Sequence, residues 1–281
     1  MPYEKLDRPE SLTWLFRPAP ATTTPSQAPT GAHDLFWPMA DGIHLACRIH
    51  ETAGPEAPMI LYFHGRSDSI AACDTIAAGY TGVGLHFAVA SYRGYGANEG
   101  RPTVSAMFAD GERILDHLLA WRNEHGHGGT LLVMGRSLGS AAAIDLCLKR
   151  QRDFKGLIIE SGFGDTLPLM AHTGVAAPED GMSEADGFGN CQKIAAITLP
   201  TLILHGARDQ TVPPSLAEKL QATSGARNKQ FLLVPGADHK TVIAQAGPLY
   251  FQTIKRFVDG ITGGGQRRPS RYALKNRGEG Q

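Results

Sequence analysis

The sequence predicts an α/β fold with a mostly parallel, doubly wound sheet that helices cover on both faces. The first observation is that short apolar runs of strand length alternate with helix-like segments along most of the 281 residues. The second is that polar clusters follow the apolar runs at their carboxyl ends, where such sheets bind ligands. The third is that residues 130–149 have the pattern of a strand, a Gly-x-Ser-x-Gly turn and a helix. An apolar content of 42% is ample for one large core.

The first regular elements are expected after an irregular N-terminal segment, residues 1–30, which is rich in Pro, Thr and Ala. Within it, the Trp-Leu-Phe run at positions 14–16 could pack onto the body of the protein. Residues 34–38 and 43–50 then predict a β-hairpin, because the Asp41-Gly42 pair between them is a typical turn signal.

The body of the chain follows, and its alternating pattern predicts further strands and helices. The expected strands are residues 58–63, 85–91, 130–134, 156–160, 201–204 and 230–234. The expected helices are residues 70–80, 103–124, 140–149, 215–223 and 242–260. Residues 166–195 hold Gly, Pro, Asp and Met in no clear period, and they predict a small cap over the site. We therefore expect one domain over residues 31–261 that includes this cap.

The end of the chain, residues 262–281, is Gly-rich and basic and is predicted to be disordered. Five basic residues and one acid lie between positions 266 and 281. Such a tail could bind a membrane surface or nucleic acid, although a solvated tail is the simpler expectation. The whole chain carries no net charge and has a pI of about 7.2, so its composition indicates no nucleic-acid partner.

Several features bear on where the protein works. The N-terminus carries early acids and prolines without an apolar core, so we expect no signal peptide. No uncharged apolar run reaches the ~18 residues of a membrane span, so we expect no integral membrane segment. The cysteines are Cys47, Cys73, Cys147 and Cys191. Their spacing shows no pairing, which indicates free buried thiols and a reducing, cytoplasmic location. The oligomeric state stays open.

A pair of histidines, His125 and His127, lies in the Gly-rich stretch that ends the helix at residues 103–124. Two histidines could indicate a metal ion, but no third ligand is evident in the sequence. We therefore expect a glycine cap of the helix and no metal site.

The turn Gly135-Arg136-Ser137-Leu138-Gly139 predicts a nucleophile elbow, with Ser137 as the nucleophile. The motif requires a strand before it and a helix after it, and both are expected here. The turn is sharp, so the two glycines let strand and helix approach each other closely. Ser137 is then exposed at the carboxyl edge of the sheet.

A serine nucleophile needs a neighbouring base, and the base needs a third group that fixes its tautomer. The chain order in this type of fold is Ser, then Asp or Glu, then His. Asp209 and His239 follow Ser137 in that order, each in a loop directly after a strand. Asp165 also follows a strand and is the alternative acid. We expect His205 and Asp238 to be loop or packing residues.

The oxyanion hole needs two backbone N–H groups. We expect one from Leu138, the residue after the nucleophile, and one from Arg66, in the loop after the strand at residues 58–63. His64 is expected to be a structural hydrogen-bonding group. The Arg66 side chain has two possible roles, lining the substrate pocket as an anion-binding group or pairing with Asp68 or Glu99.

Taken together, these motifs resemble the alpha/beta-hydrolase superfamily, and most of all its abhydrolase-domain serine hydrolases. That group includes monoacylglycerol and lysophospholipid lipases and palmitoyl-protein thioesterases. The resemblance covers residues 35–260 and includes His64-Gly65, Tyr92-Arg93-Gly94-Tyr95-Gly96 and His205-Gly206 with Val212-Pro213-Pro214. It implies an eight-stranded sheet, a Ser-Asp-His triad and no cofactor. Many relatives have His-Gly-Asn where this chain has His64-Gly65-Arg66.

The sequence thus predicts a soluble serine hydrolase that cleaves a carboxylic ester or thioester of a small-molecule or acyl substrate. Water would release the acid from an acyl-enzyme intermediate. Amide or peptide cleavage is the first alternative, since the same triad serves both reactions. The second is a ligand-binding protein without catalysis, which an intact triad disfavours.

Overall fold

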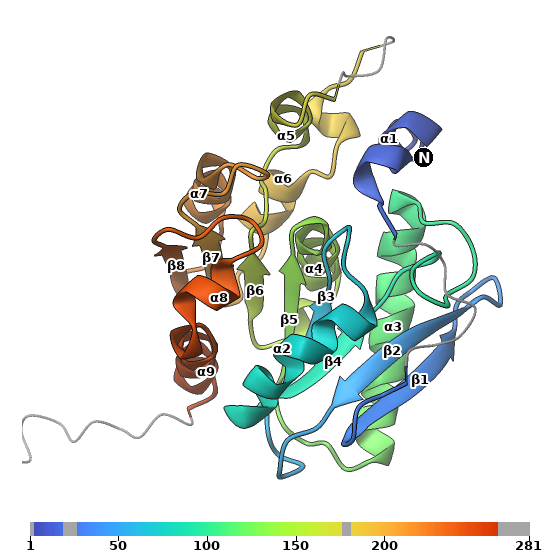
Figure 1. The fold of residues 1–281 in the computed structure, drawn as a ribbon, viewed down its shortest axis with the longest axis vertical. Helices are drawn as coiled ribbons and strands as arrows, with labels where there is room; N and C mark the ends of the chain where they lie inside the picture. Colours follow the sequence, from blue (N-terminus) through green and yellow to red (C-terminus); the bar gives the residue numbers. More distant parts are fainter. Residues whose placement is uncertain (1–2, 19–26, 176–180, 264–281) are drawn as a thin grey trace, which may run out of the picture.

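A computed structural model describes residues 3–18, 27–175 and 181–263. Eight strands form one sheet in the order β1-β2-β4-β3-β5-β6-β7-β8 (Figure 1). The strands are β1 (Ala32–Pro38), β2 (His44–His50), β3 (Met59–Phe63), β4 (His86–Ala90), β5 (Leu131–Arg136), β6 (Leu157–Glu160), β7 (Thr201–Gly206) and β8 (Lys229–Val234). The β1–β2 and β2–β4 pairs are antiparallel, and every other pair is parallel. The predicted α/β fold with an eight-stranded, mostly parallel sheet is therefore confirmed.

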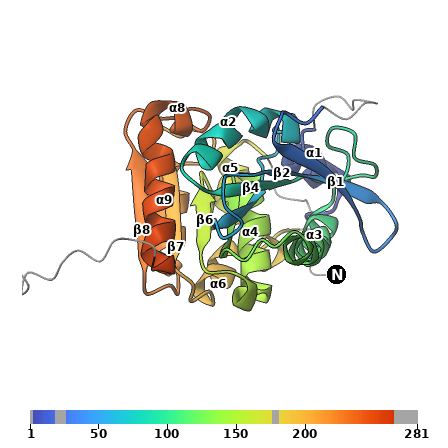
Figure 2. The ribbon, with the colours of Figure 1, turned by 90° about the horizontal axis from the view of Figure 1, so that it is seen from below.

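Helices cover both faces of this sheet (Figure 2). The longer ones are α2 (Ile70–Gly82), α3 (Val104–Glu124), α4 (Leu138–Lys149), α7 (Pro214–Thr223) and α9 (Pro248–Thr262). The shorter ones are α1 (Pro9–Leu15), α5 (Thr166–His172), α6 (Asn190–Ala195) and α8 (Val242–Ala246), with 3₁₀ turns η1 (Gln151–Asp153) and η2 (Glu184–Asp186). No helix in the described ranges is both long and apolar enough to cross a bilayer.

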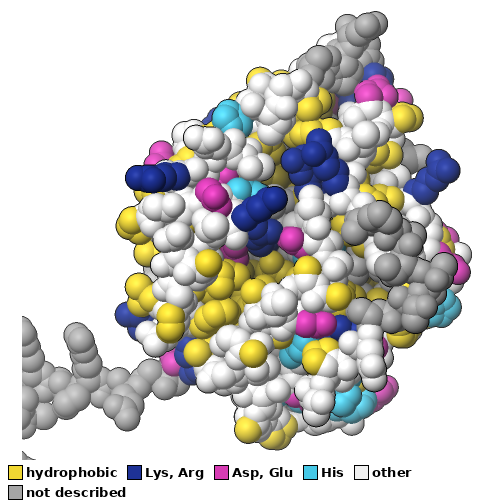
Figure 3. All heavy atoms as spheres, viewed as in Figure 1, with side chains coloured by type: hydrophobic (Ala, Val, Ile, Leu, Met, Phe, Trp, Pro, Cys, Tyr) yellow, Lys and Arg dark blue, Asp and Glu magenta, His cyan; other side chains and the backbone are white. Residues whose placement is uncertain are grey.

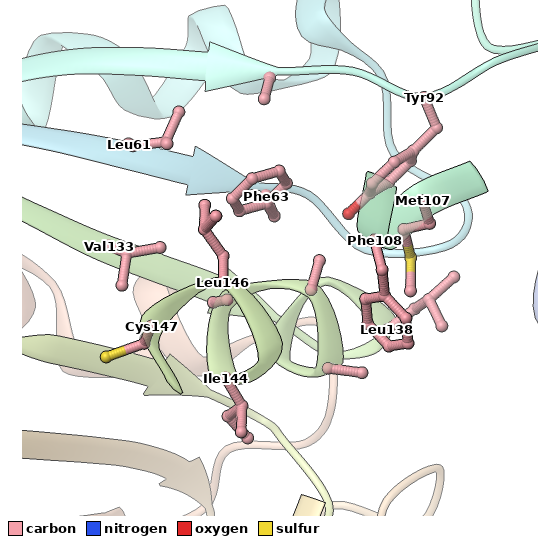
Figure 4. Packing of buried hydrophobic residues seen from close by; sticks show 14 of the residues in the cluster. Leu61, Phe63, Tyr92, Met107, Phe108, Val133, Leu138, Ile144, Leu146 and Cys147 are labelled. Atoms are coloured by element: carbon pink, nitrogen blue, oxygen red, sulfur yellow. The ribbon is translucent and has the colours of Figure 1, made fainter. Parts of the chain in front are cut away.

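Alternate residues of the central strands face two separate cores, because successive side chains of a strand point to opposite faces. Leu61 and Phe63 of β3 pack with α3 and α4, whereas Ile60 and Tyr62 pack with α2 and α9. Figure 4 shows the first of these cores, with Phe63 above Leu146 of α4. The central strands are buried on both faces, and the site lies at their carboxyl ends.

The expectation of an irregular segment over residues 1–30 is wrong for Pro9–Leu15, which form α1. Seven residues are too few for a stable isolated helix, so tertiary packing must hold α1 in place. Trp14, Leu15 and Phe16 supply that packing and are buried in the core. Figure 1 shows α1 and α5, which lies in the segment predicted to form a cap, at the end of the sheet to which β5 and β6 point.

The single helix expected over residues 242–260 is also wrong. The chain forms α8, turns at Gly247 with a φ of 55°, and begins α9 at Pro248. Gly tolerates this left-handed backbone and Pro suits the first turn of a helix, so the break follows from these two residues. The expected tail over residues 262–281 lies outside the described residues from position 264 on.

Candidate active site

The turn between β5 and α4 holds Ser137 in a strained conformation, with φ 52° and ψ −120°. A Cβ on Gly135 would lie 2.1 Å from the carbonyl oxygen of Gly139, and a Cβ on Gly139 would lie 2.1 Å from that of Phe63. Any larger residue at either position would push the strand and helix apart. The two glycines of the motif therefore permit the close approach that places Ser137 at the strand end, where it is largely buried and lines the cavities described below.

Ser137, His239 and Asp209 form a hydrogen-bonded chain. Ser137 Oγ lies 3.0 Å from His239 Nε2, and His239 Nδ1 lies 2.7 Å from Asp209 Oδ2. The other oxygen of the buried Asp209 carboxylate accepts hydrogen bonds from the N–H groups of Thr211 (2.9 Å) and Val212 (2.8 Å). These bonds fix the carboxylate, so it can orient the imidazole ring and stabilise its protonated form.

Asp165 and Asp238 are bound elsewhere, whereas His205 Nε2 lies 3.5 Å from Asp209 Oδ2. Asp165 forms an ion pair with Lys219 of α7. Asp238 accepts hydrogen bonds from the N–H groups of Lys240 and Thr241 and so stabilises its own turn. His205 Nε2 lies 2.8 Å from the Val212 carbonyl oxygen, and burial lowers the pKa of the ring. His205 is thus a neutral donor that supports the Asp209 loop.

His64 has a similar supporting position in the loop after β3. Its Nδ1 lies 2.9 Å from the Gly65 carbonyl oxygen and its Nε2 lies 3.3 Å from Ser91 Oγ. Its ring packs against Tyr92 and Tyr95. Burial lowers the pKa of this ring as well, so His64 braces the loop in its neutral form.

This loop brings Gly65 and Arg66 beside the nucleophile. A Cβ on Gly65 would lie 3.5 Å from Ser137 Cβ, which shows how near the backbone passes. Leu138 is the first residue of α4, and an N–H at that position has no partner within its helix. The positive end of the helix dipole lies at the same point. This arrangement suits a negative charge next to Ser137.

The Arg66 side chain pairs with neither Asp68 nor Glu99. Its Nη1 donates a hydrogen bond to the Trp14 carbonyl oxygen over 2.9 Å. Its own carbonyl oxygen accepts hydrogen bonds from the Arg17 N–H (3.1 Å) and the Tyr95 hydroxyl (2.7 Å). Arg66 is therefore joined to the N-terminal arm, by which we mean residues 3–17.

Sequence reasoning missed the role of Arg136, the residue directly before Ser137. Its guanidinium contacts Glu160 Oε1 (3.1 Å), Asp68 Oδ2 (2.7 Å) and the His239 carbonyl oxygen (2.7 Å). Burial disfavours its charge, but the Glu160 carboxylate holds the Arg136 pKa above its ordinary value. Arg136 thus links the end of β6 to the loops that hold Asp68 and His239. The only sequence signal is a charged residue inside the elbow motif.

Two cavities meet at Ser137. The small cavity has a volume of about 30 Å³ and is mainly apolar, with Trp14 and Leu15 of α1, Phe163 and Leu169 among its walls. By this measure it holds about two water molecules. The large cavity has a volume of about 740 Å³ and includes His239. On the face shown in Figure 3, basic side chains gather near the middle.

A third cluster lies apart from Ser137, where Glu51, His86 and His127 have possible ligand atoms within 4.8 Å of one another. Both His86 nitrogens are engaged, by the Thr52 N–H and the Gly54 carbonyl oxygen. The Glu51 oxygens lie 2.7 Å from His33 and from His127. Glu51 and His86 therefore have partners within the protein, whereas His127 Nδ1 is buried without a hydrogen-bond partner among the described residues.

Comparison with known proteins places the molecule among described relatives. The family model described as serine aminopeptidase, S33, matches residues 54–177 and 185–245. Protein bem46 of Schizosaccharomyces pombe is 30% identical over 216 residues, which are 74% of this chain and 70% of that protein. The alpha/beta hydrolase domain-containing protein 17B of Homo sapiens is 28% identical over 227 residues, 77% of this chain and 72% of that one.

Among solved structures, an esterase of Pyrococcus furiosus superposes with a TM-score of 0.68 at 15% identity. The match covers 86% of this chain and 99% of the esterase. At this identity the likeness concerns the fold.

Proposed function

Because this chain belongs to the serine aminopeptidase S33 family of the alpha/beta-hydrolase superfamily, we propose that it is a serine hydrolase that cleaves a carboxylic ester or thioester. The observation that carries the proposal is the hydrogen-bonded chain from Ser137 through His239 to Asp209. A ligand-binding protein would have no need of this arrangement, which gives a hydroxyl a base and the base an orienting carboxylate.

In the proposed reaction, Ser137 Oγ attacks the substrate carbonyl carbon while His239 Nε2 takes its proton. Asp209 stabilises the resulting imidazolium through Nδ1. The backbone N–H groups of Leu138 and Arg66 bind the oxyanion of the tetrahedral intermediate. As that intermediate collapses, His239 returns the proton to the departing alcohol or thiol. Water, activated by the same histidine, then hydrolyses the acyl-enzyme and releases the acid.

The two cavities suggest how a substrate lies in the site. His239 must protonate the leaving group, and His239 lines only the large cavity, so the alcohol or thiol belongs there. The acyl group then faces the small apolar cavity beneath Trp14 and Leu15. That cavity has room for about two water molecules, so with Trp14 and Leu15 in place it suits an acetyl-sized group.

The charges near Ser137 favour an ester over the N-terminus of a peptide. An aminopeptidase must hold a positively charged α-amino group close to the scissile bond. The acids of the large cavity, Asp68 and Glu160, both bind Arg136. Arg66 would repel an ammonium group at the same place. Amide cleavage of uncharged substrates remains the alternative reaction.

The first experiment is covalent labelling with a fluorophosphonate, which reacts with activated serines. We expect one label per molecule, at Ser137, and none in Ser137→Ala. Ser215→Ala, on the exposed side of α7, is the matched control and should label as the parent protein does. A label that persists in a folded Ser137→Ala protein would contradict the assignment.

The second experiment compares nitrophenyl esters, thioesters and nitroanilides that carry the same acyl group, from acetyl to octanoyl. We expect kcat/KM for the oxygen ester or the thioester to exceed that for the anilide at every chain length. An amino-acid anilide that is cleaved faster than either would move the proposal to the aminopeptidase reaction.

A further inference from the structure

The large cavity contains two arginines with no acidic partner in the described part of the chain. Arg66 is half-buried, and its one side-chain hydrogen bond goes to the Trp14 carbonyl oxygen. Arg17 reaches the same cavity from the N-terminal arm, and its N–H is fixed by the Arg66 carbonyl oxygen and the Tyr95 hydroxyl. The backbone therefore holds the two cationic residues side by side.

The balance of charge in this cavity is positive. Its walls carry four basic side chains, Arg17, Arg66, Arg136 and Lys240, and two acidic ones, Asp68 and Glu160. Both acids bind Arg136 and are not available to the other bases.

Neighbouring like charges destabilise each other; solvent screens part of this repulsion because Arg17 is exposed, but Arg66 is half-buried and an anion between the two would relieve the rest. Burial, and after it the charge of Arg17, lowers the pKa of the Arg66 guanidinium. A guanidinium stays protonated in proteins despite such effects, so the repulsion is not relieved by loss of a proton. An oxyanion that binds both side chains would remove it. Guanidinium groups bind carboxylate and phosphate oxygens with paired hydrogen bonds.

We propose that Arg17 and Arg66 form an anion-binding subsite, and that the substrate is an ester or thioester whose alcohol or thiol part carries a carboxylate or phosphate. This inference rests on the proposed hydrolase function. It places the anion on the leaving group because Arg17 lines the cavity of His239 and not the small cavity. The subsite makes the N-terminal arm part of the substrate-binding surface.

The test uses meta-substituted phenyl acetates that differ in charge: meta-acetoxybenzoate, its neutral methyl ester, meta-acetoxyphenyl phosphate and a cationic meta-acetoxyphenyl trimethylammonium. Each kcat/KM is divided by the rate of hydroxide hydrolysis of the same ester, which removes differences in leaving-group reactivity. The two anionic arms distinguish a carboxylate from a phosphate. We expect the corrected value to be about tenfold or more higher for at least one anion than for the neutral ester, and lowest for the cation.

Arg17→Gln and Arg66→Gln should each lower the ratio of anionic to neutral turnover by about tenfold, the lower end of the range for a hydrogen bond to a charged group. The backbone N–H of Arg66 survives its substitution. Arg17→Lys, which retains the charge, should keep most of the preference. Arg227→Gln, an exposed arginine between α7 and β8, should keep the parent ratio. A ratio unchanged in both glutamine variants would overturn the subsite.

A binding measurement separates this inference from the proposed function. Inorganic phosphate at constant ionic strength should raise the Tm of Ser137→Ala, and the rise should be smaller in Ser137→Ala/Arg17→Gln/Arg66→Gln. If the parent protein hydrolyses no ester, the proposed function fails while the phosphate result still tests the subsite. Equal corrected rates for all four esters, with no effect of phosphate on Tm, would reject the subsite and leave the hydrolase proposal standing.

Discussion

Replacing Arg136 with methionine should lower the free energy of unfolding by about 3–5 kcal/mol, the usual cost of leaving one partner of a buried ion pair without the other. Arg136 loses three contacts in this variant, with Glu160, Asp68 and the His239 carbonyl oxygen. Asp68 is partly exposed, so water can solvate it. The Glu160 side chain is only 2% exposed, and its uncompensated charge carries most of the cost.

The size of the effect therefore depends on Glu160, and a second substitution tests this. Glu160→Gln in the Arg136→Met background removes the buried charge. The glutamine amide can still form a hydrogen bond with the Tyr250 hydroxyl, which contacts Glu160 in the structure. The double variant should recover about half of the lost stability or more. Arg150→Met is the matched control, because Arg150 pairs with the more exposed Asp116 and Asp153. It should cost about 1 kcal/mol or less.

Urea unfolding at neutral pH, followed by circular dichroism, measures all of these values, and equal m-values would show that the unfolded states are comparable. A loss below about 1 kcal/mol in Arg136→Met, or a double variant less stable than the single one, would refute the reasoning. A further readout is kcat on a phenyl acetate, which should fall in Arg136→Met because the His239 loop loses its anchor. The control should keep its kcat.

Three other predictions concern the triad, the small cavity and pH. Asp209→Asn should lower kcat by a factor of about 10⁴, as in known triads. Asp165→Asn loses an ion pair with Lys219, and its kcat should stay within about tenfold of the parent value. The reverse ranking of kcat would identify Asp165 as the triad acid. Trp14→Ala should enlarge the small cavity and shift the optimum of kcat/KM toward longer acyl chains, and an unchanged chain-length profile would show that Trp14 does not limit the acyl group. Burial holds the pKa of His64 below its ordinary value of 6.5. As pH falls below 6.5, His64 in the unfolded chain therefore takes up a proton that it does not take up in the folded protein. The free energy of unfolding then decreases. His64→Gln should lose less stability between pH 7.5 and pH 5.5 in urea unfolding, and an equal or greater loss would mean that His64 is not the group responsible.

Much of the fold could be predicted from the sequence because its signals are local. The Gly135-Arg136-Ser137-Leu138-Gly139 turn requires glycine at both ends for local steric reasons. A Cβ on Gly135 would clash with the Gly139 backbone, and a Cβ on Gly139 would clash with the backbone of the adjacent strand β3. Strands β3, β5, β6 and β7 each contain a continuous apolar run, as expected for strands buried on both faces. The order of Ser137, Asp209 and His239 after β5, β7 and β8 likewise needs only the chain order and the parallel sheet.

Other features depend on contacts between distant positions, which no local pattern encodes. The Pro-rich composition near α1 predicts an irregular chain, yet burial of Trp14 and Leu15 in the body stabilises a short helix there. Arg66 is 49 positions from Arg17, and Arg136 is 103 positions from His239. These side chains meet only because the sheet and the N-terminal arm bring their loops together. The sequence offers Arg66 the acids Asp68 and Glu99 as partners, but in the fold Asp68 pairs with Arg136.

The N-terminal arm is expected to open with a free energy of its own, different from the free energy that unfolds the sheet. Burial of Leu6, Trp14, Leu15 and Phe16 in the core holds the arm, together with polar contacts of Lys5, Asp7 and the Trp14 carbonyl oxygen. The arm is a terminal segment outside the sheet, and such segments can open by local unfolding at a free energy below the global value. Amide hydrogens of Leu12 and Phe16, which bond within the arm, should therefore exchange faster than those of β3 and β5. Trp14 and Leu15 line the small cavity, which we propose for the acyl group. If so, this opening equilibrium would set the fraction of molecules able to receive a long acyl chain. The apparent affinity for such a chain would be reduced by that fraction.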